Sequence, residues 1–302
     1  MHTRPITSED LANSVIAVPP MARDKNFNFD RNENEKIIRH IEAGNVSTLL
    51  YGGNANFYHI ALSEYEDVLT QLAELAGENT LIVPSVGPAY GMMMDQAEIV
   101  KQTDYPTVMV LPHQGITTSA GVVTGLRKFA EKVGKPIVLY IKYDDFISVE
   151  GAKQLVDDGI VSWIKYAIVR EDTAVDPYLT ELVDAVDPSM IVSGIGEQPV
   201  IEHLVDFGIT GFTAGCVCIR PDLSDQLLKA VQANDLDRAR EIQSIFNPLE
   251  DLRNEINPIR VLHEAVTLAG IADTGPPLPL LSGITEAEET LVKETALNLL
   301  NS

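Results

Sequence analysis

Short apolar runs rich in β-branched residues recur along the chain at intervals of about 20 to 35 residues. Segments with helical spacing of apolar residues separate these runs, which is typical of repeated strand–helix units on a parallel sheet. Eight runs predict strands, at Ser14–Val18, Ser47–Tyr51, Thr80–Pro84, Thr107–Leu111, Pro136–Tyr140, Val161–Lys165, Met190–Ser193 and Gly211–Ala214.

The intervals between the strands predict helices. They include Asn32–Glu42, Glu64–Leu75, Ala120–Val133, Val149–Asp157, Tyr178–Ala185 and Pro199–Asp206. Gly134 and Gly208 follow two of them, and glycine is common just past a helix end. Eight strands favour a closed (β/α)8 TIM barrel. A doubly wound open sheet usually has fewer strands, and no G-x-G-x-x-G follows the first strand.

The strand signals stop at Pro221, and only helical patterns follow, at Ser224–Gln232, Leu236–Ile245, Pro258–Leu268 and Glu286–Leu300. Residues 273–279 contain three prolines and predict an extended connector, because proline fixes φ and removes a hydrogen-bond donor. We therefore expect a catalytic barrel over residues 1–220 and a helical appendage packed on it over residues 221–302.

Composition narrows the classes of function. A length of 302 residues suits one barrel with an extension, and a net charge of −22 disfavours binding to nucleic acid. No run of about 18 apolar residues predicts a membrane span, and residues 1–10 lack the apolar stretch of a signal peptide, so we expect a cytoplasmic protein. Cys216 and Cys218 are interpreted as reduced packing residues, since no nearby ligands complete a metal site.

Barrel active sites lie at the carboxyl ends of the strands, where three features attract attention. Lys165 ends an apolar strand, and an amine with poor solvation loses its proton and can attack a ketone. Tyr140 ends the preceding strand and is a candidate proton relay. The loop Gly52–Asn56 offers backbone and amide donors for a carboxylate. Alternatively, Lys165 reaches the rim or pairs with Glu197, Tyr140 is an ordinary rim residue, and the loop is only a tight turn.

In this order and spacing, these residues resemble the dihydrodipicolinate synthase / N-acetylneuraminate lyase family of Schiff-base aldolases. The resemblance extends to Ser193-Gly194, to Asn257-Pro258 and to Leu278-Pro279. It implies that Lys165 forms the Schiff base, that Tyr140 relays protons, that no cofactor is needed, and that the protein is a homo-oligomer, either a tetramer or a dimer.

Three departures from the family pattern limit what the resemblance implies. The paired threonines after the second strand are Gly53 and Asn54, so carboxylate binding would depend on Gly52, Gly53 and the Asn54 amide. The synthases of the family have a tyrosine after the fourth strand that crosses a dimer interface, and this chain has Pro112-His113-Gln114 there instead. They also have an arginine after the fifth strand that holds the second substrate's carboxylate at the entrance of the site, and Ile141–Asp145 contains no arginine. A lysine or tyrosine in that loop could partly replace the arginine, but Asp144 and Asp145 disfavour an anionic second substrate, so a neutral, hydroxylated substrate tail is expected.

Candidate contacts for that tail share a position near a strand end. They are His113, Asp144, Ser193 and Glu197. For each of these residues, the alternative is an ordinary position at the surface or in a helix cap.

The sequence thus predicts a Schiff-base lyase that acts on a pyruvate-like 2-oxo acid, by aldol cleavage or condensation or by dehydration of a 2-keto-3-deoxy sugar acid. One alternative is a non-catalytic or regulatory protein that binds a 2-oxo acid. Another is a true 4-hydroxy-tetrahydrodipicolinate synthase, which the missing arginine disfavours. A metal-dependent aldolase would need clustered ligands at the strand ends, and only His113 and scattered acids are available there.

Overall fold

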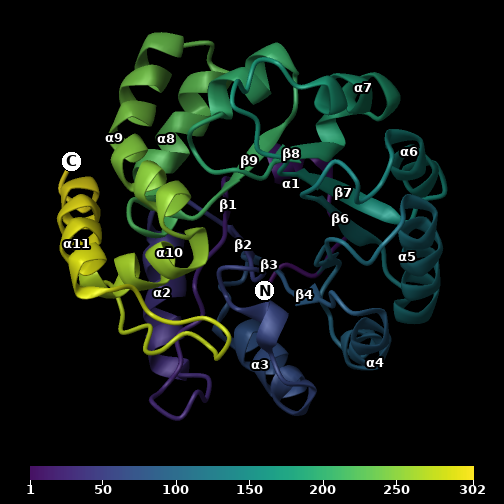
Figure 1. Cartoon of the computed structure of the whole chain (residues 1–302), viewed down its shortest axis with the longest axis horizontal. Helices are drawn as coiled ribbons and strands as arrows, with labels where there is room; N and C mark the ends of the chain where they lie inside the picture. The colour runs from purple at the N-terminus through teal and green to yellow at the C-terminus, as the bar shows by residue number, and fades with distance from the viewer.

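All eight predicted strands form, and every pairing between them is parallel. The computed structural model describes residues 1–302. Its strands are β1 (Ile16–Ala17), β2 (Thr48–Leu50), β3 (Leu81–Val83), β4 (Ser85–Val86), β5 (Val108–Val110), β6 (Ile137–Ile141), β7 (Val161–Tyr166), β8 (Ile191–Ser193) and β9 (Gly211–Ala214). They enclose the centre of the molecule, and the helices surround them (Figure 1).

The third predicted strand is split at Pro84, which explains why nine strands occupy eight positions. The sheet order is β3-β2-β1-β9-β8-β7-β6-β5-β4, so its two ends are the neighbours β3 and β4. Proline has no backbone N–H to give to a ladder, although the Pro84 carbonyl still accepts a hydrogen bond from Met109 N at 2.9 Å. The sheet closes through this segment, which confirms the (β/α)8 barrel.

Helices alternate with the strands. They are α1 (Ser8–Ala12), α2 (Arg31–Ala43), α3 (Leu62–Leu75), α4 (Tyr90–Lys101), α5 (Ser119–Val133), α6 (Val149–Asp157), α7 (Pro177–Ala185) and α8 (Pro221–Gln232). Of these, α1 and α4 are additions to those that the sequence predicted. Side chains of Asp30, Thr118, Ser148 and Asp176 accept hydrogen bonds from the first turns of α2, α5, α6 and α7.

The helix expected over Pro199–Asp206 contains a π-helical turn over Glu202–Asp206. Short 3₁₀ turns occupy Phe57–His59, Pro188–Met190 and Cys216–Cys218.

The last three helices are α9 (Leu236–Glu255), α10 (Pro258–Leu268) and α11 (Glu286–Leu300), and together with their connectors they are called the tail. They lie on the side of the barrel opposite α5 and α6 (Figure 1). α9 extends ten residues beyond the predicted end at Ile245 and contains Pro248. A proline removes one helical hydrogen bond, but α9 packs against α8, α10 and α11, and these contacts hold the helix together.

One hydrophobic core joins the barrel to the tail. Leu249 of α9, Val261 of α10 and Val292 of α11 belong to the same buried cluster as the strands. Burial of this apolar face fixes α9 over the barrel, so the polar residues on its last turns have a defined position above the strand ends. None of the helices combines the length and hydrophobicity that a membrane-spanning segment requires.

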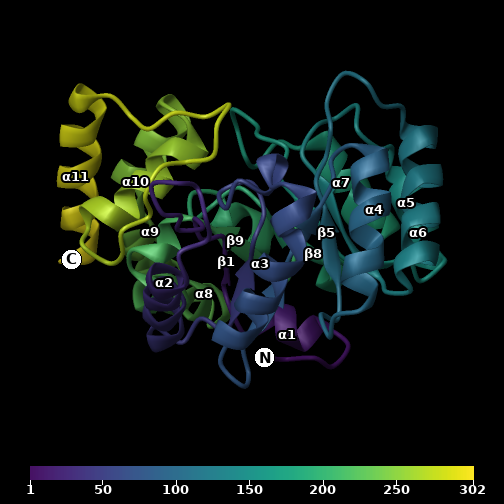
Figure 2. The ribbon, with the colours of Figure 1, turned by 90° about the horizontal axis from the view of Figure 1, so that it is seen from below.

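The two ends of the barrel are covered differently. The N-terminal segment and α1 lie at one end, whereas the connector between α10 and α11 lies toward the opposite end (Figure 2). The carboxyl ends of the strands therefore face the tail, and the amino ends face the first residues of the chain.

Candidate active site

Lys165 and Tyr140 lie side by side at the carboxyl end of the barrel. The register of β6 and β7 places the two residues directly opposite each other. Lys165 Nζ lies 4.6 Å from the centre of the Tyr140 ring. Both side chains are buried, with 5% of Lys165 and 9% of Tyr140 exposed. The amine therefore points into the protein and not into bulk water.

A cavity of about 230 Å³ opens beside this pair. Residues at or after the ends of β1, β2, β6, β7, β8 and β9 contribute to its lining, and residues 253–259 of the tail close one side. The lining residues are Val18, Gly53, Asn54, Tyr58, Tyr140, Lys142, Lys165, Ala167, Val169, Gly194, Ile195, Gly196, Thr213, Ala214, Gly215, Arg253, Asn254, Asn257, Pro258 and Ile259. Three of them are basic and none is acidic.

The Lys165 amine has the electrostatic properties of a nucleophile. Burial lowers its pKa to about 7, and the positive charges of Lys142 and Arg253 act in the same direction. No hydrogen bond or ion pair engages Nζ, so the alternative pairing with Glu197 does not form; Glu197 accepts a hydrogen bond from Ser224 at 3.1 Å. A substantial fraction of the amine is therefore neutral and free near pH 7.

Tyr140 keeps its proton in this surrounding. Burial raises the pKa of its phenol, and Tyr143 adds to that effect, whereas Arg253 opposes it. A phenol that stays protonated beside a partly neutral amine can donate a proton to a leaving hydroxyl group.

The loop after β2 supplies backbone donors to the cavity. The N–H groups of Gly53 and Asn54 donate to no protein acceptor. The Asn54 side-chain amide donates one hydrogen bond to the Val18 carbonyl at 2.9 Å, which leaves its second hydrogen free. The loop can therefore bind a carboxylate mainly through its backbone.

Gly194 leaves room for the Lys165 side chain. A Cβ atom at Gly194 would lie 2.6 Å from Ala167 Cβ and 3.0 Å from Lys165 Cε. Any larger residue at this position would displace the lysine or the strand beside it.

The other predicted contacts do not line the cavity. Gly52 faces Met109 inside the barrel, where a Cβ would lie 2.8 Å from Met109 Cε. The Ser193 hydroxyl is 2.8 Å from His203 Nδ1 within the core. His113 lines a separate apolar groove beside α4 and α5.

Asp144 also lies outside the cavity lining. Its side chain is 61% exposed and forms an ion pair with Arg170 at 2.6 Å. The loop after β6 leads it outward, and this carboxylate is already neutralised by a neighbouring guanidinium.

The sequence did not predict several lining residues, among them Tyr58, Lys142 and Arg253. Tyr58 stands in the 3₁₀ turn after β2, and a Cβ at Gly53 would lie 3.5 Å from its ring. Lys142 follows β6 and was considered only as a partial substitute for an absent arginine. Arg253 arrives from α9, beyond the predicted end of that helix. The neighbouring Asn-Pro start of α10 was the signal that could have drawn attention to the end of α9.

A buried acidic pair holds Arg253 in place. Arg253 Nη2 lies 2.9 Å from Glu250 Oε2 and also donates to the Ile195 carbonyl. Burial raises the pKa of Glu197 well above its usual value, and the adjacent charge of Glu250 raises it further. The neutral form of Glu197 is thereby favoured, while Arg253 pairs with Glu250.

Glu197, Glu250 and Cys216 place ligand atoms within 4.8 Å of one another, as a metal site would. However, Arg253 already occupies the cationic position beside Glu250. Burial also raises the pKa of the Cys216 thiol well above its usual value, so the thiolate that a metal requires is disfavoured. The arrangement fits a hydrogen-bonded anchor for the arginine.

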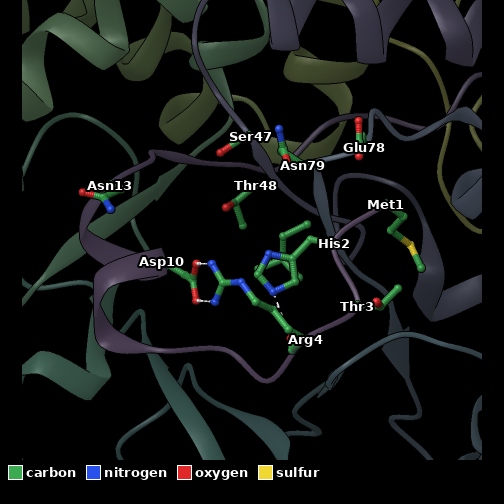
Figure 3. A pocket seen from close by; sticks show the side chains of 11 residues that line it. Met1, His2, Thr3, Arg4, Asp10, Asn13, Ser47, Thr48, Glu78 and Asn79 are labelled. Atoms are coloured by element: carbon green, nitrogen blue, oxygen red, sulfur yellow. Dashed lines mark hydrogen bonds and ion pairs between the residues drawn. The ribbon is translucent and has the colours of Figure 1, made fainter.

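A larger hollow of about 580 Å³ lies at the amino end of the barrel, beside residues 1–4 and the start of β2. Arg4 and Asp10 face each other across it in a two-bond ion pair of 2.8 and 2.6 Å (Figure 3). No buried nucleophile lines it, and this end of a barrel usually serves stability.

Comparison with known proteins agrees with this geometry. The model of the Dihydrodipicolinate synthetase family matches residues 12–297. The chain belongs to this family. Members of the family are lyases of the aldolase type that act on small molecules.

Curated relatives carry two kinds of name. The 4-hydroxy-tetrahydrodipicolinate synthase of Exiguobacterium sibiricum is 26% identical over 82% of this chain and 84% of its own length. A probable 5-dehydro-4-deoxyglucarate dehydratase of Xanthobacter autotrophicus is 23% identical over 85% of this chain and 87% of its own. The family therefore spans at least two reactions at this level of identity.

Solved structures share the fold. Dihydrodipicolinate synthase from Bacillus clausii superposes with a TM-score of 0.84 at 22% identity, covering 95% of this chain and 97% of that one. A prophage protein of the family from E. coli K12, in complex with pyruvate, superposes with a TM-score of 0.83 at 17% identity, covering 95% and 98%.

Proposed function

We propose that this protein is a Schiff-base lyase in which Lys165 condenses with the ketone of a pyruvate-like 2-oxo acid. The observation that carries the proposal is a buried amine with a pKa of about 7 that has no partner and lines a cavity at the carboxyl end of the barrel. An ordinary structural lysine would be ion-paired or solvated.

The residues of the cavity support a sequence of steps. The neutral Nζ adds to the carbonyl carbon, and one of its protons moves to the oxygen to give the carbinolamine. Tyr140 then gives a second proton to that oxygen, so that water leaves and the iminium and a tyrosinate remain. The resulting iminium withdraws electrons from the neighbouring carbon, which permits aldol cleavage, condensation or loss of a hydroxyl group. The free N–H groups of Gly53 and Asn54 hold the substrate carboxylate.

Reductive trapping tests the proposal. Incubation with pyruvate and borohydride should add the reduced pyruvate to the Lys165 peptide in the mass spectrum and inactivate the protein. An unmodified Lys165 under these conditions would refute the Schiff base. A panel of 2-keto-3-deoxy acids, and of aldehydes with pyruvate, would then define the reaction. Activity that survives EDTA would set aside a metal-dependent aldolase.

4-Hydroxy-tetrahydrodipicolinate synthase is a second candidate, because the relative from Exiguobacterium sibiricum carries that name and Lys142 offers a basic group near the missing entrance arginine. A direct assay for 4-hydroxy-tetrahydrodipicolinate separates the two. Trapping of pyruvate without turnover of any substrate in the panel would instead favour a binding or regulatory protein.

A further inference from the structure

A buried ion pair lies beside the candidate active site. It joins Glu250 and Arg253 of α9, whose Oε2 and Nη2 atoms are 2.9 Å apart. None of the Glu250 side chain and 10% of the Arg253 side chain is exposed. A buried ion pair contributes little to stability, because the cost of removing both charges from water offsets their attraction. A role in the chemistry of the cavity explains the pair better than a role in holding the fold together.

The ion pair has a defined orientation, with its positive end toward the cavity. Arg253 lines the cavity, whereas Glu250 does not. Arg253 Nε donates to Glu250 Oε2 at 2.9 Å, and Nη2 donates to the Ile195 carbonyl. Because the guanidinium is planar, these contacts fix both its position and its direction. A positive charge is therefore held at a constant place in the cavity wall.

A second buried acid adjoins Glu250 without cancelling this charge. Oxygen atoms of Glu197 and Glu250 lie within 4.8 Å of each other. Each carboxyl group has one buried oxygen without a protein partner, Glu197 Oε2 and Glu250 Oε1. Burial and the charge of Glu250 raise the pKa of Glu197, so its neutral form is favoured and its hydroxyl can donate to Glu250. The group then contains one carboxylate and one guanidinium, and only the guanidinium faces the cavity.

Lys165 and Arg253 approach the same short segment after β8. A Cβ atom at Gly194 would lie 3.0 Å from Lys165 Cε, and a Cβ atom at Gly196 would lie 2.9 Å from Arg253 Nη2. Only Ile195 separates the two glycines, so the amine and the guanidinium occupy neighbouring positions in the cavity wall. A charge at this position disfavours a second positive charge on the amine, and it lowers the pKa of Lys165 in addition to burial.

No acid opposes this effect from the other elements around the cavity. The titratable side chains that line it together with Lys165 are Tyr58, Tyr140, Lys142 and Arg253. Burial raises the pKa of both phenols, so they are neutral at pH 7. Lys142 lies on a loop, with its Nζ 5.7 Å from the centre of the Tyr143 ring. Arg253 is the cation of the lining whose place hydrogen bonds fix.

From this arrangement we propose that Arg253 is a positioning residue for the proposed reaction. Its fixed ion pair with Glu250 directs a positive charge at Lys165, which keeps the amine neutral and able to attack a ketone. The guanidinium acts through its charge and does not touch the reacting atoms. The proposal rests on the proposed Schiff-base function, because it concerns the same nucleophile.

Chemical labelling measures the protonation of Lys165 without any substrate. The whole protein is treated with acetic anhydride from about pH 5 to about pH 10, with a free amine as internal standard, and mass spectrometry of the Lys165 peptide gives the rate. Arg253→Met with Glu250→Gln replaces the pair by neutral side chains of similar size, a kind of change that folded proteins commonly tolerate. The midpoint of labelling should rise by about one pH unit, so that the rate falls nearly tenfold at about pH 6 and is equal at about pH 10. An unchanged midpoint would overturn the proposal.

The same helix provides a matched control. Arg238 and Glu241 form an exposed ion pair of α9 at 2.7 Å, with the same spacing of three residues. Arg238→Met with Glu241→Gln should keep the parent midpoint, because water and salt screen that pair. Equal shifts in the two double variants would assign the effect to a general disturbance of α9 and contradict a role of Arg253.

A further double variant should shift the midpoint in the other direction. Glu197→Gln with Glu250→Gln removes both acids and leaves Arg253 on the Ile195 carbonyl, so its charge acts on Lys165 unopposed. The midpoint should fall by about half a pH unit or more. Altered packing alone would not move the midpoint up in one variant and down in the other. If the first variant does not fold, this one decides, and a midpoint at or above that of the parent contradicts the proposal.

Trapping of pyruvate separates this inference from the proposed function. If the labelling midpoints shift as expected but borohydride does not trap pyruvate on the parent protein, the role of Arg253 stands and the Schiff base fails. If pyruvate is trapped and the midpoints of parent and variants coincide, the Schiff base stands and the positioning role is refuted.

Discussion

Lys165 and Lys135 occupy opposite ends of the barrel and show what burial alone does not determine. Burial lowers the pKa of both amines. Lys135 lies just before β6, at the amino end, and its Nζ donates to the carbonyls of Val100, at 3.0 Å, and of Thr103. Lys165 is the penultimate residue of β7, at the carboxyl end, and has no partner.

The difference between the two lysines is the availability of a lone pair. A nitrogen that donates to helix-terminal carbonyls must keep its protons and holds α4 in place. A nitrogen that faces a cavity without an acceptor can give up a proton and attack a carbonyl. Function thus depends on an empty space and a missing partner, and a perturbed pKa by itself would not separate the two sites.

The largest expected effect on trapping comes from replacing each of these lysines by alanine in turn. Lys165→Ala should abolish trapping of pyruvate, by more than about 10³-fold, because Lys142, the other amine of the lining, lies over the Tyr143 ring and not beside Tyr140. Lys135→Ala should retain trapping and lower the midpoint of urea unfolding, since it removes hydrogen bonds to the end of α4. Mass spectrometry of the trapped protein and urea titration measure the two effects, and equal trapping in both variants would remove the distinction.

Tyr140→Phe should slow turnover by about 10²- to 10⁴-fold, the usual range for loss of a general acid. The ring remains beside Lys165, so the amine keeps its apolar neighbour and trapping should persist at long incubation. Steady-state rates on the best substrate of the panel provide the measurement. The control is Tyr90→Phe, on a residue of α4 that is 49% exposed and lies outside the cavity.

The pH dependence of trapping tests whether the Lys165 amine is neutral, which distinguishes it from Lys135. The pKa of Lys165 is lowered to about 7, so the neutral amine is the major form above pH 7 and becomes scarce below it. The trapping rate should be level above about pH 8 and fall about fiftyfold from pH 7 to pH 5, approaching a tenfold fall per pH unit below about pH 6. Stopped-time mass spectrometry with cyanoborohydride follows the rate. A rate that keeps rising to pH 10 would show that the amine is solvated.

Tyr58→Phe should have a smaller effect. Burial raises the pKa of Tyr58, with contributions from Tyr140 and Tyr143, and its hydroxyl has no protein partner in the cavity. If the Tyr58 phenol takes part in proton transfer to the substrate, turnover of the variant should fall by about tenfold while trapping is retained. An unchanged turnover number would show that the ring only packs against Gly53.

The site and the fold differ in how far the sequence predicts them. Strands are recognisable because each buried run is apolar, and the register that pairs Tyr140 with Lys165 follows once both are placed at strand ends. α4 was not predicted, because Tyr90, Gly91 and exposed Met92 blur the contrast between its faces. Arg253 was not predicted either, since the helix was expected to end at Ile245, before it reaches the cavity.

The loops explain the remaining errors of placement. A residue that follows a strand in the sequence must lie near the carboxyl end of the barrel. Whether its side chain faces the cavity depends on the tertiary contacts of the loop. Asp144 turns outward to Arg170, and Ser193 turns inward to His203. A local pattern holds no information about those distant partners.

The amino end provides the smallest expected effect on activity. Partial burial alone would raise the pKa of Asp10, but hydrogen bonds from Arg4 and Thr7 outweigh it and lower the pKa. Its carboxylate thus stabilises the fold above its unfolded pKa, and this contribution is lost as pH falls through the lower folded value. Asp10→Ala should reduce the free energy of unfolding by about 1 kcal/mol at pH 7, and by less near pH 3, with an unchanged trapping rate. If trapping changed instead, the two ends of the barrel would be coupled, and assigning stability to one end and chemistry to the other would be wrong.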